Sequence, residues 1–279
     1  MTRTGALSRA LLISAFAIIV STSAAACGGA STTPTTPATS TTGRQSFTEL
    51  APPLAERCDK SDDGAVAKVV VTASDGTKLA AAEWGDGPRG VVLLPQRGAD
   101  LCGWWDFATE LADAGYHVLA IDFRATGYSD VGSVRDLTRD AVGAVEWLKQ
   151  TGATNVVLIG ASMGATTALV TAGRHPDLAA GVVSLSMPRS IDVTGGDADG
   201  PTTPQEAAPQ IEVPLLMCWA RSDGSATDPQ PIVDAAPATT KQVVTRDGGQ
   251  HGWGLLTDGP HDVRPEVLAF LEQVLSSSM

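Results

Sequence analysis

The chain has 279 residues, of which 43% are hydrophobic and 18% charged, and its formal net charge at pH 7 is −12. An acidic chain with only five lysines lacks the basic surface that nucleic-acid binding requires, so we expect no nucleic-acid partner. Its four cysteines form no Cys-x-x-Cys pair and no His/Cys cluster, so the sequence predicts no metal site.

The first residues have the three-part layout of a secretory signal. Arg3 and Arg9 precede an apolar run over residues 10–20, and small residues follow up to Cys27. The apolar run is too short to span a bilayer core, which favours a signal peptide over residues 1–26. Small residues before Cys27 resemble the bacterial lipobox, which implies an acylated cysteine and a lipoprotein on the outer face of a bacterial cell membrane. Plain cleavage and full secretion is the alternative.

A polar segment separates this signal from the rest of the chain. Residues 27–50 are mostly small, polar or Pro, so they bury too little surface to order and are expected to form a tether. Residues 51–279 are long enough for one substantial core, and we expect one domain there. Membrane contact is therefore expected through the N-terminal lipid only. The sequence gives no indication of the oligomeric state.

Two of the remaining cysteines are candidates for a disulfide. Cys58 and Cys102 lie in segments that read as loops, and an oxidising compartment favours pairing of such residues. Cys218 lies in the apolar run 214–219, where a small buried thiol is expected.

Strand and helix patterns alternate along the domain. Two short runs around the Asp75-Gly76 turn predict an antiparallel hairpin, and later apolar runs predict strands separated by helices. The predicted strands are 66–72, 78–84, 90–95, 117–123, 155–159, 181–187, 213–219 and 242–245, and the predicted helices are 104–114, 134–151, 165–173, 229–236 and 265–275. This alternation predicts the α/β class, with a mostly parallel sheet covered by helices on both faces.

Ser162 lies at the apex of a predicted strand-turn-helix unit. The segment Gly160-Ala161-Ser162-Met163-Gly164 follows an apolar strand and opens onto a helix. Glycines on both sides of the serine allow the strand and the helix to pass closely, and such a turn holds the hydroxyl up as a nucleophile. An ordinary turn serine is the alternative.

From about residue 60 onward the chain resembles an α/β-hydrolase domain, similar to dienelactone hydrolases and other small esterases. The resemblance rests on the Ser162 turn, on the order serine, acid, histidine, and on the strand-helix alternation. It implies an eight-stranded sheet with the hairpin at one edge and no required cofactor. Only about 25 residues separate the strands near Met187 and Val213, where this family places its cap, so a minimal cap is expected.

A serine hydroxyl needs a base, and the base needs an acid that orients it. His251 lies in a loop after the last predicted strand, and Asp223 follows the strand ending near Trp219, which are the positions where the family places its base and its acid. His261 and Asp228 are the alternatives for these two roles. Asp122 lies in a segment that resembles a structural loop motif of the family, so it is left out of the triad.

Two backbone donors are expected to stabilise the oxyanion. One is the N–H of Met163, directly after the nucleophile. The other is expected from the loop after the strand ending at Leu94, where relatives often have His-Gly and this chain has Pro95-Gln96-Arg97-Gly98. Arg97 N–H is the first candidate and Gln96 the second.

The sequence therefore predicts a serine hydrolase that forms an acyl-enzyme on carboxylic esters, with a small or short-chain ester as its small-molecule substrate. Thioesters, lactones and peptides suit the same residues, and a non-catalytic surface binding module is the competing class.

Overall fold

The computed structural model describes residues 52–61, 64–196 and 200–276. The predicted signal peptide, Cys27 and the tether lie outside these residues. In the part of the chain that is described, no helix combines the length and the apolar character needed to cross a membrane.

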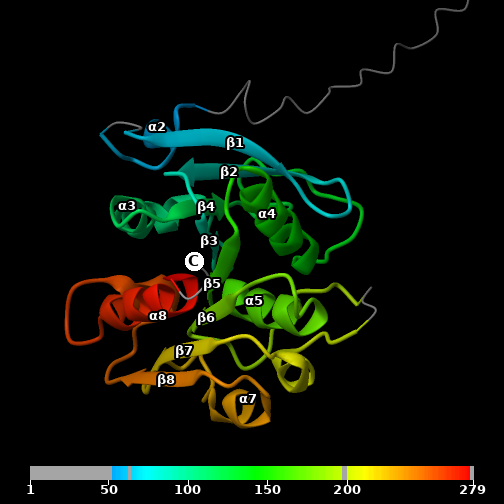
Figure 1. Cartoon of the computed structure of the whole chain (residues 1–279), viewed down its shortest axis with the longest axis vertical. Coiled ribbons are helices and arrows are strands. Elements are labelled where there is room, and N and C mark those ends of the chain that lie inside the picture. The colour runs from blue at the N-terminus through cyan, green and yellow to red at the C-terminus, as the bar shows by residue number, and fades with distance from the viewer. Residues whose placement is uncertain (1–51, 62–63, 197–199, 277–279) are drawn as a thin grey trace, which may run out of the picture. The chain divides into compact units, whose positions relative to one another are not determined.

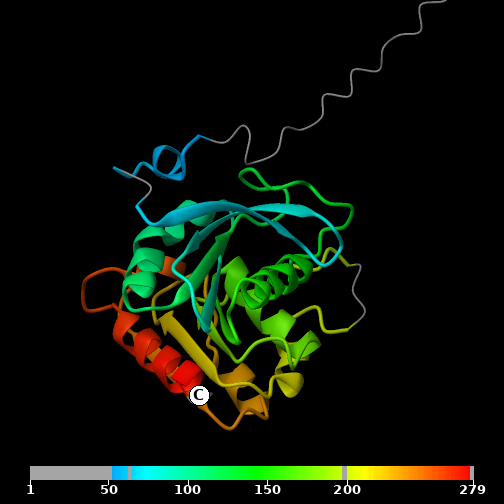
Figure 2. The same ribbon diagram turned by 45° about the horizontal axis from the view of Figure 1, so that its top comes forward.

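Eight strands form one sheet in the order β1-β2-β4-β3-β5-β6-β7-β8. The strands are β1 (Val66–Thr72), β2 (Lys78–Trp84), β3 (Arg89–Leu94), β4 (His117–Ile121), β5 (Asn155–Ala161), β6 (Gly181–Leu185), β7 (Leu215–Ala220) and β8 (Lys241–Arg246). Only the pairs β1/β2 and β2/β4 are antiparallel; all other pairs are parallel. The β1/β2 hairpin forms one edge of the sheet and β8 the other (Figures 1 and 2). The predicted eight-stranded, mostly parallel sheet is confirmed.

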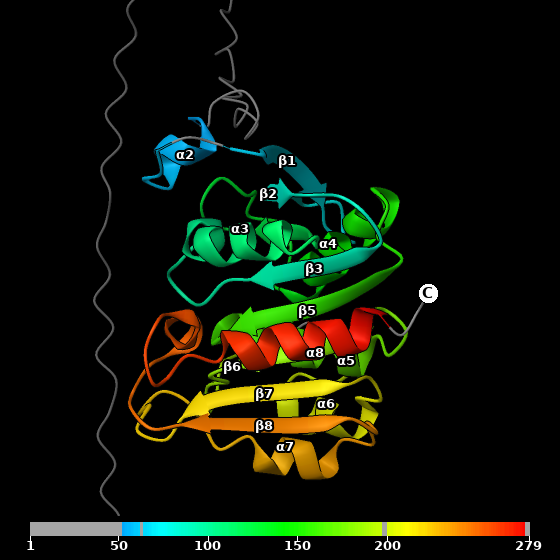
Figure 3. The same cartoon turned by 60° about the vertical axis from the view of Figure 1, so that its left-hand side comes forward.

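Helices cover both faces of the sheet. The helices are α2 (Leu54–Arg57), α3 (Trp105–Asp113), α4 (Thr138–Gln150), α5 (Met163–Arg174), α6 (Pro204–Ala207), α7 (Gln230–Ala235) and α8 (Arg264–Ser276). Buried residues of α3 and α8 belong to one apolar cluster, and those of α4, α5 and α7 belong to a second cluster on the opposite face. Figure 3 shows α3 and α8 together in front of the sheet. The central strands β4 and β6 are buried along their whole length, as expected for parallel strands covered on both sides.

The helix before the Ser162 turn starts later than the sequence predicted. We expected a helix from Val134, but α4 begins at Thr138. The carboxylate of Asp136 accepts hydrogen bonds from the backbone N–H and the hydroxyl of Thr138, which caps the helix at that point. The Val134 carbonyl instead accepts a hydrogen bond from Arg124 at 2.5 Å. The residues before Thr138 therefore form a loop, and that loop lines a pocket beside the site.

The segment between β6 and β7 contains little regular structure in its described part. It holds the four-residue α6 and a three-residue 3-10 helix, Ala208–Gln210. Neither could cover a long substrate. The carboxyl ends of the parallel strands β3 to β8 meet at one edge of the sheet, where ligands bind in open sheets of this kind.

Candidate active site

Ser162 lies in the tight turn between β5 and α5. Its φ of 50° is in the left-handed region, which costs free energy for a residue other than glycine. Gly160 and Gly164 of the turn are required, because a side chain at either position would collide with the backbone. A Cβ on Gly160 would lie 2.1 Å from the Gly164 carbonyl oxygen, and a Cβ on Gly164 would lie 2.1 Å from the Leu94 carbonyl oxygen. The strand and the helix therefore pass each other as closely as the sequence predicted, with the serine at the apex.

Asp223 and His251 come from the loops after β7 and β8. Asp223 Oδ2 lies 2.7 Å from His251 Nδ1, and the carboxylate side chain is only 3% exposed. Its other oxygen, Oδ1, accepts backbone N–H groups of Ser225 and Ala226 at 3.0 and 3.3 Å. A carboxylate held this way favours the imidazole with its proton on Nδ1, which leaves Nε2 free to accept a proton.

Ser162 and His251 line the same pocket, which has a volume of about 240 Å³. Gln96 and Arg97 also line it, and Ser190 and Ser225 contribute hydroxyl groups. No hydrogen bond joins Ser162 Oγ to His251 in the described residues. Such bonds are often long in a free enzyme and shorten when substrate is bound. The structure thus brings the three predicted triad residues to one location.

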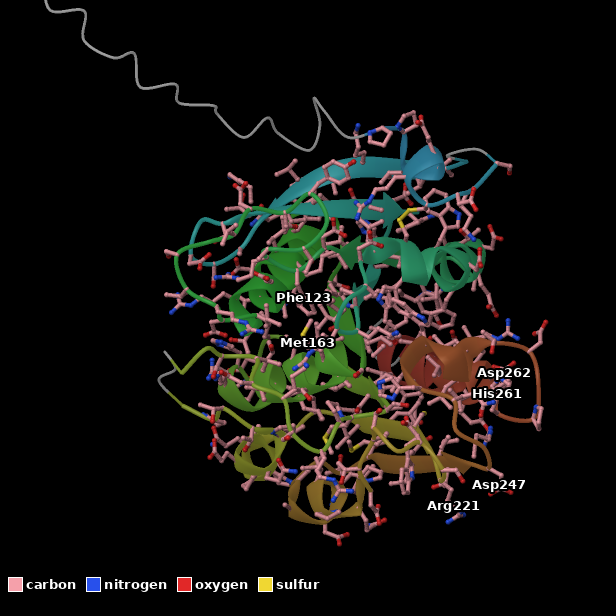
Figure 4. All side chains as sticks on the ribbon, turned by 180° about the vertical axis from the view of Figure 1, so that it is seen from behind. Phe123, Met163, Arg221, Asp247, His261 and Asp262 are labelled. Atoms are coloured by element: carbon pink, nitrogen blue, oxygen red, sulfur yellow. A yellow bond between two sulfur atoms is a disulfide. The ribbon has the colours of Figure 1, made fainter. Side chains whose placement is uncertain are left out.

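The alternative base, His261, and the alternative acid, Asp228, lie outside the Ser162 pocket. His261 Nε2 is within 2.9 Å of Thr257 Oγ1 in an exposed turn, and Figure 4 shows it beside Asp262, away from Met163. Asp228 accepts the backbone N–H of Gln230 at 2.9 Å and so caps the start of α7. Neither residue lines the pocket of Ser162.

Three backbone donors are available around the serine. Met163 is the first residue of α5, so its N–H has no partner within the helix. Gln96 and Arg97 follow β3, which lies directly beside β5, with Leu94 opposite Gly160. The N–H groups of Gln96 and Arg97 donate to no described residue. Both candidates for the second oxyanion donor are therefore free and next to the pocket.

The side chain of Gln96 has a placement that the sequence did not predict. Its Oε1 is buried without a hydrogen-bond partner, and a Cβ on Gly252 would lie 2.3 Å from it. Gly252 has a φ of 58°, and it directly follows His251. The glutamine therefore packs against the backbone that carries the histidine. The His-Gly-Trp sequence was the available signal, because a glycine next to a catalytic histidine suggests a close contact.

Asp122 is structural, as expected. Arg57 Nη2 donates to both of its oxygens, at 2.9 and 2.8 Å, and the backbone N–H groups of Leu101 and Tyr128 donate at 3.0 Å each. Burial raises the pKa of Asp122, and Arg57 opposes that shift. The predicted Cys58–Cys102 disulfide is confirmed and lies next to this cluster in sequence, since Cys58 follows Arg57 and Cys102 follows Leu101.

A larger pocket begins on the other side of Met163. It has a volume of about 450 Å³ and shares Arg97 with the pocket of Ser162. Phe123, Val134, Leu137 and Met163 supply its apolar lining, and Figure 4 shows Phe123 and Met163 close together. Its size falls within the usual range of about 300 to 1,000 Å³ for small-molecule sites.

No metal centre accompanies these pockets within the described residues. No group of three or more His, Cys, Asp or Glu side chains is arranged to hold an ion there. Cys218 is buried as expected, and burial raises the pKa of its thiol.

Comparisons with known proteins agree with this fold. Residues 90–211 match the family model for the alpha/beta hydrolase fold. Epoxide hydrolase B of Mycobacterium tuberculosis is 36% identical over 104 residues, which are 35% of this chain and 28% of that protein. Epoxide hydrolase A of the same organism is 34% identical over 122 residues, covering 41% and 37%. The chain thus spans about a third of the length of these curated relatives.

Solved structures extend the likeness over most of the chain. An esterase of Pyrococcus furiosus superposes with a TM-score of 0.64 at 20% identity, covering 79% of this chain and 94% of that one. A monoacylglycerol lipase of Paleococcus ferrophilus has a TM-score of 0.57 at 19% identity, covering 72% and 99%. These likenesses extend the fold beyond the segment matched in sequence. The chain thus has the alpha/beta hydrolase fold, and its residues 90–211 match the model of that family.

Proposed function

We propose that the chain is a serine hydrolase that cleaves carboxylic esters through an acyl-enzyme. The observation that carries the proposal is the shared pocket of Ser162 and His251, in which a buried carboxylate, Asp223, is hydrogen-bonded to the far nitrogen of the histidine. A strained serine, a base and an orienting acid form the constellation that activates a hydroxyl near neutral pH.

The acyl-transfer half-reaction follows from this geometry. Ser162 Oγ attacks the ester carbonyl carbon while His251 Nε2 accepts its proton. The N–H groups of Met163 and Arg97, or of Gln96 in place of Arg97, stabilise the oxyanion, and each such donor contributes about 10²- to 10³-fold to the rate. His251 then gives the proton to the leaving alcohol. Water deprotonated by His251 attacks the acyl-enzyme and releases the acid.

Epoxide opening is the second candidate, because the two Mycobacterium tuberculosis relatives are named as epoxide hydrolases. The chemistry of Ser162 disfavours it. A serine oxygen that opened an epoxide would form an ether, and an ether has no carbonyl carbon that water could attack to release the product. An ester gives an acyl-enzyme that water can hydrolyse, so the serine favours ester substrates.

A fluorophosphonate probe tests the proposal and also separates it from the binding-module alternative. We expect the probe to label the wild-type protein at Ser162, and we expect Ser162→Ala to lose both the label and esterase activity while it remains folded by circular dichroism. Loss of activity should be on the order of 10⁴-fold or more in kcat. Near-normal turnover of 4-nitrophenyl butyrate by Ser162→Ala, or release of diols from epoxides by the wild type, would overturn the assignment.

We also propose, from the sequence of the first residues, that Cys27 is acylated and anchors the enzyme to the outside of a bacterial cell membrane. Stable anchoring requires at least two acyl chains. The wild type should fractionate with membranes and Cys27→Ala should be released. Equal recovery of both proteins in the membrane fraction would argue against the lipid.

A further inference from the structure

Three arginines near the site form no ion pair and no hydrogen bond with the residues that the structure describes. Of the arginines in the described ranges, all but Arg97, Arg135 and Arg189 make an ion pair or hydrogen bond. Arg135 is near enough to Asp192 to help lower the pKa of that carboxyl, after the hydrogen bond from the Thr194 backbone, but it forms no ion pair with it. Unpaired cations are notable in a chain whose net charge is −12.

All three arginines border the pockets around Ser162. Arg97 lines both the Ser162 pocket and the apolar pocket behind Met163. Arg135 lines the apolar pocket. Arg189 lines a pocket of about 320 Å³ that shares Pro188, Ser190 and Ile191 with the Ser162 pocket. These three arginines and one aspartate, Asp192, therefore line the pockets, although the protein as a whole is acidic.

The carboxylate that Arg135 influences, Asp192, is already hydrogen-bonded. Asp192 Oδ1 accepts hydrogen bonds from Thr194 and from the backbone N–H of Gly195. Arg124 also lines the apolar pocket, but Asp140 and Asp75 occupy its guanidinium. Arg97 and Arg135 are thus the cations available at the apolar pocket.

The order of the strands separates the acyl side from the leaving-group side. Ser162 follows β5; the apolar pocket is lined by the loop after β4, and His251 follows β8 at the opposite side of the sheet. His251 must protonate the leaving alcohol, so that group lies on the His251 side. The acyl chain then extends the other way, past Met163 and into the apolar pocket.

Building on the proposed esterase function, we propose that the preferred substrate is a half-ester of a dicarboxylic acid. Its methylenes occupy the apolar pocket, and its free carboxylate binds between Arg97 and Arg135. A guanidinium binds a carboxylate through two parallel N–H donors, and this charge-assisted pairing is about twice as strong as a neutral hydrogen bond. The reaction itself is unchanged: water cleaves the acyl–oxygen bond and releases the alcohol and the dicarboxylate.

The test compares two substrates with the same leaving group. Mono-4-nitrophenyl glutarate carries the carboxylate, and 4-nitrophenyl butyrate lacks it. We expect the wild type to favour the glutarate by about tenfold in kcat/KM at low ionic strength, as expected for one charge-assisted hydrogen bond, and added salt to reduce this ratio. We compare variants by the ratio of kcat/KM for the glutarate to kcat/KM for the butyrate, because a general loss of activity affects both values equally.

Substitutions of single arginines identify the guanidinium that binds the substrate carboxylate. Arg135→Gln should lower the ratio by about fivefold, and Arg135→Glu should bring it below one, because a like charge repels the carboxylate. Arg221→Gln is the control; it removes an exposed arginine that lies 3.5 Å from Asp247 on the His251 side, and it should leave the ratio unchanged. Arg189→Gln should also leave it unchanged, because Arg189 borders a different pocket.

The outcomes separate this inference from the proposed function. Butyrate hydrolysis that depends on Ser162, without preference for the glutarate, would overturn the inference and leave the esterase intact. A ratio that falls in Arg189→Gln but not in Arg135→Gln would also overturn it. If neither ester is hydrolysed, monoethyl glutarate binding to Ser162→Ala decides the matter: calorimetry must detect it, and Arg135→Gln must weaken it at least about threefold.

Discussion

The two sides of Ser162 are built differently. The N-terminal flank, residues 95–104 and 122–137, is held by a disulfide and by buried ion pairs: Arg57 with Asp122 and Arg124 with Asp140 have side chains between 0% and 5% exposed. The C-terminal flank, residues 221–229 and 247–257, carries the proposed acid, Asp223, and the proposed base, His251. Its ion pair between Arg221 and Asp247 is largely exposed, with side chains 66% and 98% accessible.

The two flanks therefore contribute differently to the site. Asp122 and Arg124, buried charged groups of the N-terminal flank, are held in ion pairs and do not line the Ser162 pocket. His251, in the C-terminal flank, is 29% exposed at its side chain, and its hydrogen bond to Asp223 leaves Nε2 unused. We infer that the N-terminal flank fixes the oxyanion donors and the acyl pocket, and that the C-terminal flank supplies proton transfer.

The largest effect should come from the C-terminal flank. We expect His251→Ala to lower kcat for 4-nitrophenyl butyrate by about 10⁴-fold, because it removes the base that activates Ser162. His261→Ala is the matched control, since it removes a histidine ten residues away that lies outside the pocket. It should retain activity within about twofold of wild type. Full activity in His251→Ala would remove this flank from the mechanism.

The fold was largely predictable from the sequence, and the site was predictable only in part. The strands β1 and β2 were predicted at their observed bounds, because alternation and an Asp-Gly turn are local signals. The turn around Ser162 and its downstream partners could be read from order along the chain. The packing of Gln96 on Gly252 was missed: the glycine after His251 indicated a close contact, but nothing in the sequence identified Gln96, 156 positions away, as its partner.

The disulfide and the ion pairs that hold the N-terminal flank were only partly predictable from the sequence. The disulfide could be predicted because the cysteines were few. Helix α2, which is four residues long, was missed, and so was the ion pair of Arg57 with an aspartate 65 residues away. A short helix at the surface has no periodicity to detect, and long-range ion pairs depend on the folded path of the chain.

Removing the disulfide should have the next largest effect. Cys58 and Cys102 close a loop with a sequence separation of 44. We expect Cys58→Ser with Cys102→Ser to lower the free energy of unfolding by about 4 kcal/mol, because the crosslink restricts the unfolded chain. Urea titration would measure the loss. Added reductant should destabilise the wild type to a similar extent and leave the variant unaffected; equal stability of variant and wild type would show that the disulfide is not a brace.

The buried ion pair should be worth somewhat less. Arg57→Gln leaves the fully buried Asp122 without its cation, and such a loss costs about 3 kcal/mol of unfolding free energy. Arg89→Gln is the control, since it breaks a pair with Glu272 whose side chains are 27% and 62% exposed. Exposed pairs contribute about 0 to 1 kcal/mol. Comparable losses of unfolding free energy in the two variants would show that the buried pair stabilises the fold no more than an exposed pair does.

Acid should weaken the N-terminal flank through Asp75. Burial by itself raises the pKa of this carboxyl, but hydrogen bonds from Arg124 and Thr77 outweigh burial and lower the pKa from 3.8 to about 2. A lowered folded-state pKa contributes stability above pH 4 that is lost as the pH falls toward 2. The loss from Asp75→Asn, about 2 kcal/mol at pH 7, should therefore shrink by about 1 kcal/mol at pH 3. Denaturant unfolding at both pH values checks this, and a constant difference would contradict it.

The smallest effect concerns the length of neutral acyl chains. The described part of residues 188–213 holds no helix longer than the four-residue α6, so the mouth of the site offers no cover for a long chain. A methylene contributes about 0.8 kcal/mol, or roughly fourfold in kcat/KM, only while the apolar pocket of the N-terminal flank has room to bury it. We therefore expect kcat/KM for 4-nitrophenyl esters to decline from about C4 to C12, without a jump in rate at a lipid–water interface. Each rate is corrected by the rate of Ser162→Ala on the same ester, which removes spontaneous hydrolysis. Faster turnover of the C12 ester, or interfacial activation, would mean that the loop between β6 and β7 forms a lid.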